Sequence, residues 1–292
     1  MESIDITKSD YPRVCPEGVR PEIFTLEDIQ RMLLPLKITP FMAKELMRFL
    51  WLDKCNDVHS RYCYTTGIPF SNLLIDQAFK IKKFVDNEEV IDRFEGKPFI
   101  TVSNHPLGAL DGILLLDIIG RHRPDFKVMV NMFLNYLTAM RPSFIAVDAM
   151  GSSNEAKRTA SMLGVRQTIA HIRDGHPVGF FPAGAVSKVD KTLHISDREW
   201  QPSLLRLIAQ LKVPIVPIYF HQHNSTFFNI LGMIHWGLRT LRLPRELFNK
   251  TGKEIHISFG EPIMPEEQAK YKDVKELGLM LRQRTYDLKK NK

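Results

Sequence analysis

The pattern of apolar and polar residues changes near residue 95 of the chain. Before that point, residues 25–36, 41–52 and 71–85 carry apolar side chains at helical spacing. The first of these segments opens on a threonine followed by glutamate and aspartate, as the first turn of a helix does. We therefore expect residues 1–95 to form a helical N-terminal region.

From residue 98 onward, short apolar runs alternate with helical patterns. The runs that predict strands are residues 99–104, 126–131, 143–148, 177–182, 214–220 and 254–263. The helical patterns are residues 111–122, 133–140, 154–175 and 202–212. Such alternation predicts a mostly parallel sheet flanked by helices, so we assign residues 96–292 to one α/β domain.

Polar or conformationally special residues follow several of the predicted strand ends. They are His105, Asp148, Pro182 and His221. In open α/β sheets, ligands bind beyond the carboxyl ends of the strands. We therefore expect these positions to line one crevice.

The segment SNHPLGALDG, residues 103–112, contains the pair of residues most suited to catalysis. An imidazole titrates near neutral pH, so His105 can act as a general base. Asp111 can orient that ring if Pro106–Gly108 form a turn. Asp111 could equally serve as a helix cap, and a lone histidine at a strand end is more often structural than catalytic. The pair alone leaves these alternatives open.

The overall composition indicates a folded protein with a preference for anionic partners. Of its 292 residues, 44% are apolar and 25% charged, and the formal net charge is +7. A basic protein favours phospholipid surfaces, nucleic acids or acidic proteins. No block of like charges resembles a nucleic-acid-binding tail, so we expect no nucleic acid partner.

Two observations concern the cellular compartment. Cys15, Cys55 and Cys63 are an odd number without metal-ligand spacing, which predicts free thiols and a reducing compartment. The N-terminus has no signal-peptide core.

The HQH sequence at 221–223 lacks an obvious third ligand, so we expect no metal.

The longest run without charged residues, 213–238, contains two prolines and three histidines and does not predict a membrane span. The overlapping segment FFNILGMIHWGLRTLRL, residues 227–243, combines apolar residues with Arg239 and Arg242. It fits a helix lying on a membrane surface and, equally well, an ordinary helix packed on a core.

Four segments together resemble the motifs of the glycerolipid acyltransferase superfamily. SNHPLGALDG resembles the first motif, and FFPAGAVSK (180–188) resembles the third, usually F-P-E-G-x-x-S. VPIVPIYF (213–220) resembles the fourth, and FIAVDAMG (144–151) lies where the second belongs. The four occur in the right order over roughly residues 98–262.

The chain also departs from the common pattern of that superfamily. Five residues separate His105 from Asp111 where four are usual, Ala183 replaces the glutamate of the third motif, and Ala149 replaces an arginine after the second. With YFHQHNS and LRLPRELFNKTGKEIHISFGEPI, these changes resemble a bacterial branch often labelled hemolysin-like. That branch includes the O-acyltransferases of ornithine and glycine lipids.

The resemblance implies an acyltransferase that needs no cofactor or metal. It implies acyl carrier protein, or acyl-CoA, as the donor and the hydroxyl group of a lyso-lipid, of ornithine- or glycine-lipid type, as the acceptor. His105 and Asp111 would be catalytic, and backbone N–H groups at the Gly184 turn would stabilise the oxyanion. The expected substrate-binding residues are Asn104, Gly108, Lys157, Arg158, Pro182, Gly184, Ser187 and Lys188.

Three other functions stay open at this stage: lysophosphatidic acid acylation, hydrolysis of a thioester or lipid ester, and a non-enzymatic, hemolysin-like role at membranes. Loss of the glutamate and arginine argues against a glycerol-3-phosphate type of acceptor. The expected location is cytoplasmic, peripheral on the inner face of the cytoplasmic membrane.

Overall fold

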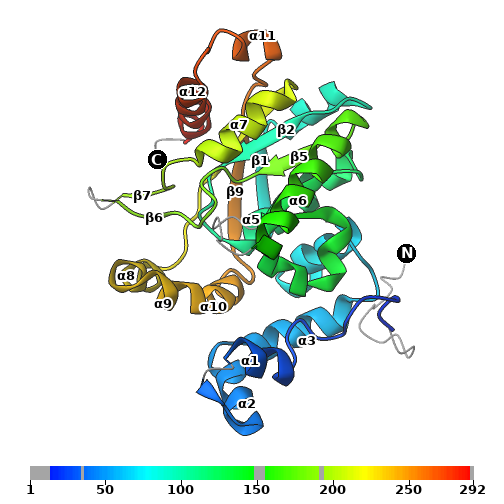
Figure 1. Ribbon diagram of the computed structural model, residues 1–292, viewed down its shortest axis with the longest axis vertical. Helices are drawn as coiled ribbons and strands as arrows, with labels where there is room; N and C mark the ends of the chain where they lie inside the picture. Colours follow the sequence, from blue (N-terminus) through cyan, green and yellow to red (C-terminus); the bar gives the residue numbers. More distant parts are fainter. Residues whose placement is uncertain (1–13, 34–35, 148–154, 191–193, 290–292) are drawn as a thin grey trace.

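A seven-stranded sheet forms the centre of the computed structural model, which describes residues 14–33, 36–147, 155–190 and 194–289 (Figure 1). The strands, in spatial order, are β1 (Lys82–Asp86), β9 (Glu254–Phe259), β8 (Ile215–Phe220), β2 (Ile100–Ser103), β5 (Val178–Phe180), β3 (Lys127–Asn131) and β4 (Phe144–Val147). All neighbouring pairs are parallel except β8 and β9. The predicted α/β class with a mostly parallel sheet is confirmed.

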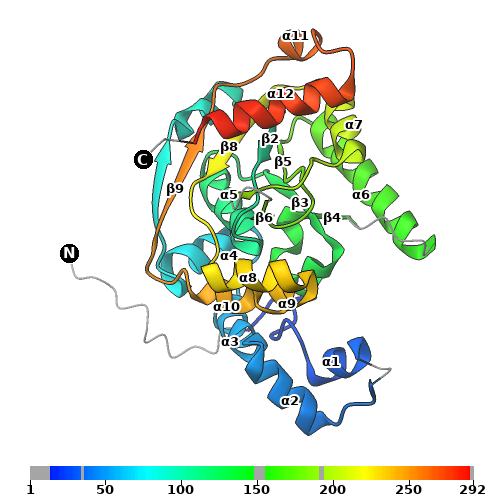
Figure 2. The same cartoon turned by 90° about the vertical axis from the view of Figure 1, so that its left-hand side faces the viewer.

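Helices cover both faces of this sheet (Figures 1 and 2). One face packs against α4 (Ile68–Leu73), a π-helical turn (Leu74–Ala78), the 3-10 helix Glu88–Phe94 and α5 (Ala109–His122). The other face packs against α6 (Glu155–Arg173), α7 (Pro202–Leu211) and α12 (Val274–Asp287), with α11 (Pro265–Gln268) before α12. Two hydrophobic clusters, one on each face, therefore stabilise the sheet.

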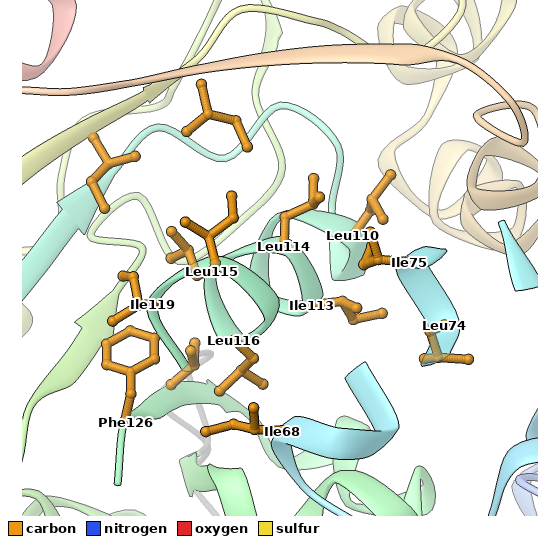
Figure 3. Close-up of a cluster of buried hydrophobic side chains, with 14 of the residues drawn as sticks. Ile68, Leu74, Ile75, Leu110, Ile113, Leu114, Leu115, Leu116, Ile119 and Phe126 are labelled. Atoms are coloured by element: carbon orange, nitrogen blue, oxygen red, sulfur yellow. The ribbon is translucent and has the colours of Figure 1, made fainter. Parts of the chain in front are cut away.

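Helix α5 lies at the centre of the first cluster (Figure 3). Leu114, Leu115 and Leu116 are consecutive and all have no exposed surface, so the helix is buried on every side. Burial of each such leucine contributes roughly 1.5–3 kcal/mol. Gly120 permits close approach of α4, because a Cβ atom there would lie 2.7 Å from the Ile68 side chain. This burial makes α5 a rigid base for any side chain in its first turn.

The expected helices before residue 70 are present as α1 (Leu26–Met32), α2 (Pro40–Phe49) and α3 (Leu52–Tyr62). Thr25 caps α1 through a reciprocal capping box with Asp28. The helix predicted over residues 71–85 is wrong at its end, because β1 occupies 82–86 and pairs with β9. The apolar residues in that stretch fit the spacing of a helix and the alternation of a strand equally well. The sheet therefore begins on the N-terminal side of the expected boundary at 95.

The helix predicted over residues 133–140 is also wrong. Two 3-10 turns, Met132–Tyr136 and Thr138–Ser143, take its place. Leu137 between them has ψ 74°, which is outside the helical range. The two turns join β3 to β4, which are parallel neighbours in the sheet.

Cys15 and Cys63 form a disulfide, so the expectation of free thiols is wrong for these two residues. The bond joins the segment before α1 to the end of α3, and Cys55 in α3 is the free cysteine. A separation of 48 residues gave no cue to this pairing.

A layer of three short helices connects β8 to β9: α8 (Thr226–Ile234), α9 (Trp236–Leu241) and α10 (Leu243–Phe248). In both views this layer lies at the opposite end of the sheet from α12 (Figures 1 and 2). The helical expectation for residues 227–243 is confirmed, with a break at His235. Within the described residues, no helix has both the length and the apolar character needed to cross a bilayer.

Candidate active site

His105 and Asp111 meet where β2 leads into α5. The Nδ1 atom of His105 lies 2.9 Å from Oδ2 of Asp111. The strand ends at Ser103, and Asp111 lies in the first turn of the helix. Because a carboxylate only accepts hydrogen bonds, Nδ1 carries the hydrogen and Nε2 keeps its lone pair. The imidazole is thus held in the tautomer that can take a proton from a substrate.

The Asp111 carboxylate is fixed by more than the imidazole. Its Oδ2 atom also accepts hydrogen bonds from the backbone N–H groups of Leu107 (2.9 Å) and Gly108 (3.0 Å). The side chain has no exposed surface. Burial raises the pKa of the Asp111 carboxyl, and the hydrogen bonds from His105 and the two backbone groups oppose that effect. Asp111 therefore both caps α5 and orients the ring.

Gly108 explains how five intervening residues can still bring the pair together. Its φ of +80° lies in the region that glycine favours, and it is the N-cap of α5. A Cβ atom there would lie 3.1 Å from Leu243 and 3.4 Å from Val186. Both the turn and the close approach of α10 therefore require glycine. The turn is what brings His105 and Asp111 together across five intervening residues.

The loop after β5 is joined to the histidine through Ser187. The Ser187 N–H donates to the His105 carbonyl at 2.8 Å. The Ser187 hydroxyl is buried and donates to Oδ1 of Asp197 at 2.6 Å. Ser187, expected to bind substrate, therefore joins the first and third motifs within the protein.

Asp197 is a residue of this site that the sequence analysis missed. Its Oδ1 atom accepts a hydrogen bond from the His105 N–H at 3.1 Å, and its Oδ2 accepts one from the Trp200 indole at 3.3 Å. Its own N–H donates to the Tyr286 hydroxyl of α12 at 2.8 Å. Burial raises the pKa of Asp197, while the bonds from Ser187 and His105 lower it. The one signal in the sequence is Trp200, three residues later, whose indole N–H needs an acceptor when it is buried.

The imidazole is enclosed on one side and open on another. The Phe181 ring lies against it with centroids 4.4 Å apart and planes inclined by 31°. The His105 side chain keeps 18% of its surface exposed. An oriented, partly exposed imidazole beside an aromatic ring can remove a proton from a hydroxyl group brought to the surface.

Three expected binding residues have their polar groups engaged within the protein. The Asn104 amide bonds both the N–H and the carbonyl of Phe220 at the end of β8. The Pro182 carbonyl accepts from the Gln201 N–H at 2.9 Å. The Gly184 N–H donates to the Phe181 carbonyl at 2.9 Å, so it is not free to stabilise an oxyanion. These groups of Asn104, Pro182 and Gly184 therefore hold neighbouring segments of the protein together.

The basic residues expected near the crevice differ in position. Lys188 is exposed and begins the hairpin of β6 (Lys188–Val189) and β7 (Ile195–Ser196). The side chains of Lys157 and Arg158 in α6, and Asp148, lie outside the described residues. Arg239, not predicted, is buried and donates to the carbonyls of Ser187 (3.1 Å) and Val186 (2.5 Å). It supports the third-motif loop from α9.

A second buried polar group lies behind the pair. Burial lowers the pKa of Lys250, and the negative charges of Glu246 and Asp111 oppose that effect. The Lys250 Nζ atom donates to Asn224 Oδ1 at 3.2 Å. A cation thus lies within electrostatic range of the Asp111 carboxylate.

Two surface hollows lie away from the pair. One is on α12 around Tyr271 and Met280, and the other is among the N-terminal helices around Arg20 and Asp53. The hydrogen-bonded His105–Asp111 pair marks the site by its chemistry. The described residues contain no group of three or more His, Cys, Asp or Glu side chains that could hold a metal ion. His221, part of the HQH sequence, bonds Ser258 at 2.8 Å.

Comparison with known proteins identifies similar chains. A family model described as Acyltransferase matches residues 39–292. A lyso-glycine lipid O-acyltransferase of Bacteroides thetaiotaomicron is 30% identical over 237 residues, covering 77% of this chain and 82% of that protein. One from Phocaeicola vulgatus is 29% identical over 169 residues, covering 56% and 58%. The solved 1-acyl-sn-glycerophosphate acyltransferase of Thermotoga maritima aligns with a TM-score of 0.49 and 15% identity over 90% of this chain and 93% of its own.

Proposed function

This chain belongs to the acyltransferase family, and we propose that it transfers a fatty acyl group from a thioester to the hydroxyl group of a lyso-glycine lipid. The observation that carries the proposal is the His105–Asp111 pair, oriented by a 2.9 Å hydrogen bond and partly open to solvent. A relative with 30% identity over most of both chains is named for that acceptor.

In the proposed reaction, Nε2 of His105 takes the proton from the acceptor hydroxyl group. The resulting alkoxide attacks the thioester carbonyl carbon and forms a tetrahedral intermediate. The carbon–sulfur bond then breaks, and the imidazolium returns the proton to the leaving thiolate. Asp111 stabilises the imidazolium and keeps Nδ1 as the donor. A base of this kind contributes about 10²–10⁴-fold to the rate.

The donor in this proposal is an acyl thioester of acyl carrier protein or coenzyme A. The net charge of +7 suits both, because each carries negative charge near its thiol arm. No covalent acyl-enzyme is needed, since the hydroxyl attacks the thioester directly. Asn104, Gly108, Pro182, Gly184 and Ser187 would shape the binding site through the contacts described above. An anionic head group would bind to basic residues, for which Lys157, Arg158 and Lys188 are the candidates from the sequence.

We place the reaction on the inner face of the cytoplasmic membrane, with the enzyme bound peripherally. A lyso-lipid with one acyl chain resides in a bilayer, so the enzyme must work at a surface.

The test is an assay of the purified chain with defined donors and acceptors. Acyl carrier protein and coenzyme A thioesters are each combined with lyso-glycine lipid, lyso-ornithine lipid or lysophosphatidic acid, and products are identified by mass spectrometry. Acyl transfer to lyso-glycine lipid is the expected result. Preference for lysophosphatidic acid would overturn the proposed acceptor.

Two other results would overturn the proposed reaction itself. Release of free fatty acid at the same rate with and without acceptor would identify a hydrolase. Vesicle leakage without any donor, retained in a His105→Ala variant, would identify a membrane-perturbing protein.

A further inference from the structure

The two helices α8 and α9 expose an unusual concentration of apolar side chains. The α8–α9 face consists of Phe227, Ile230, Met233, Ile234, Trp236, Leu238 and Leu241. Ile234 is 69% exposed and Trp236 is 56% exposed. Soluble proteins rarely leave such a contiguous group uncovered, and those that do use it to bind a partner.

We propose that the α8–α9 face docks the enzyme on the surface of an anionic phospholipid bilayer. This inference rests on the proposed function, because a lyso-lipid acceptor is presented by a bilayer. The inference identifies which surface of the enzyme contacts the bilayer.

The orientation of α8 is the first support. Phe228 and Asn229 point into the protein, with 1% and 7% of their surfaces exposed. Phe227, Ile230 and Ile234, at helical spacing, lie on the solvent side. A helix on a water-facing surface would carry polar residues there. The outward side is thus built for an apolar environment.

Charge is the second support, and it selects the kind of partner. No aspartate or glutamate occurs between Glu199 and Glu246, and Glu246 is fully buried. Arg242 borders the face, with its guanidinium 4.5 Å from the Phe227 ring centroid and its Nε atom bonded to the buried Glu246. Apolar side chains on two helices that carry no acidic residue, with an arginine beside them, match the acyl and phosphate layers of an anionic leaflet.

Position is the third support. Arg239 of α9 bonds the carbonyls of Val186 and Ser187, and Ser187 in turn bonds His105. Leu243, the first residue of α10, lies against Gly108. The docking layer is therefore built onto the same loops that hold the His105–Asp111 pair. A lipid in the bound leaflet would have only a short path to the imidazole.

The N-terminal helices offer a competing surface, with Phe41 73% and Phe49 77% exposed. Its charge pattern is less suited to an anionic bilayer. Acidic side chains pair with arginines on these helices, Arg48 with Glu45 and Arg61 with Asp57, all of them exposed. We therefore choose α8–α9 and make the other surface an arm of the test.

The test is flotation of the full chain with vesicles of phosphatidylethanolamine containing about 30% phosphatidylglycerol, with pure phosphatidylcholine as the neutral comparison. The variant Ile230→Ser/Ile234→Ser/Trp236→Ser removes the centre of the face. The matched control is Met162→Ser/Leu163→Ser/Leu279→Ser on α6 and α12, where the side chains are 57%, 51% and 61% exposed. We expect the variant to lose about tenfold in bound fraction and the control to retain binding.

The proposal is overturned if the variant floats like the unaltered chain, or if only Phe41→Ser/Phe49→Ser abolishes flotation. It is also overturned if sedimentation velocity shows a dimer that the variant converts to monomer, because a second copy would then cover the face. Activity on acceptor dispersed in detergent separates this inference from the proposed function. The variant should retain it, whereas an unaltered chain that floats but acylates no acceptor would refute the function alone.

Discussion

The carboxylate of Asp197 accepts a hydrogen bond from the backbone N–H of His105 across 92 residues of sequence. The same Oδ1 atom accepts the hydroxyl of Ser187, so one buried side chain fixes the backbone of the histidine and the loop of the third motif. Asp197 acts through His105 and is a positioning residue.

Replacing Asp197 should reduce turnover more than substrate binding. Asp197→Ala leaves three donors without their acceptor, the His105 N–H, the Ser187 hydroxyl and the Trp200 indole, at a cost of about 1–3 kcal/mol each. We expect kcat to fall by about 10–100-fold with a smaller change in KM, and Asp197→Asn, which keeps an acceptor oxygen, to recover part of the loss. Asp190→Asn, in the nearby hairpin where Asp190 caps the His194 N–H, is the control and should leave kcat unchanged. Equal losses in kcat for Ala and Asn would contradict the positioning role.

Removing the imidazole should abolish catalysis without unfolding the protein. His105 is partly exposed, so His105→Ala should keep the circular dichroism spectrum while activity falls by about 10²–10⁴-fold. The chain contains a matched control at the other end of α5, where His122 Nδ1 lies 2.7 Å from Asp92 Oδ1. His122→Ala removes a similar pair far from the site and should keep full activity. A His105→Ala enzyme with normal turnover would end the mechanism proposed above.

Gly108→Ala tests whether the turn between the catalytic residues depends on glycine. The φ of +80° and the 3.1 Å approach to Leu243 both oppose a side chain. Gly252 has φ +69° with nothing within 4 Å of its Cβ position, so Gly252→Ala measures the backbone cost alone, about 1–2 kcal/mol. We expect Gly108→Ala to lower the melting temperature further and to lose activity, measured by differential scanning fluorimetry and the transfer assay. If Gly108→Ala and Gly252→Ala had equal melting temperatures, the Leu243 side chain would move aside at no measurable cost.

Much of the fold could be predicted because local patterns express it. The run of leucines in α5 predicts a buried helix, and the short apolar runs of β2 and β8 predict buried strands. His105 and Asp111 are close enough in sequence for one turn to join them. The strand β1 could not be predicted from residues 71–85, where Ile81, Phe84 and Val85 fit a helix as well as a strand. Only its pairing with β9 decides between the two.

The parts of the site that the sequence analysis missed depend on contacts between distant segments. Asp197 lies in the irregular stretch between β7 and α7, and Arg239 lies in the short helix α9. Neither position carries a periodic signal. Both residues act because the β6–β7 hairpin and α9 lie close to the end of β2 in the folded chain. A local sequence pattern does not predict contacts between such distant segments.

The disulfide predicts a specific thiol count. Cys15 and Cys63 are joined, and Cys55 is free. Burial raises the pKa of the Cys55 thiol to about 12, so the folded protein should react slowly with a thiol reagent at neutral pH. Denatured without reductant, the chain should show one reactive thiol, and after reduction three. Three thiols without reductant would restore the original expectation of free cysteines.

Glu246 should make the stability of the α8–α10 layer depend on pH. Burial raises the pKa of this carboxyl, but hydrogen bonds from the Ser225 hydroxyl and N–H, with Lys250 and Arg242, outweigh it and lower the pKa below its ordinary 4.5. A folded-state pKa below the unfolded value means that this stability is fully present above about pH 4.5 and is lost as pH falls through the folded value.

Glu246→Gln removes the charge and keeps the shape, so at neutral pH it should cost about 2 kcal/mol of unfolding free energy. Below pH 4 the difference from the unaltered chain should shrink, because protonation then removes the same charge. Urea unfolding at several pH values measures both. Glu261, exposed and paired with Arg93, is the control, since exposed pairs contribute little and Glu261→Gln should change stability far less. A difference that stayed constant from neutral pH to pH 3 would show that Glu246 acts through its shape alone.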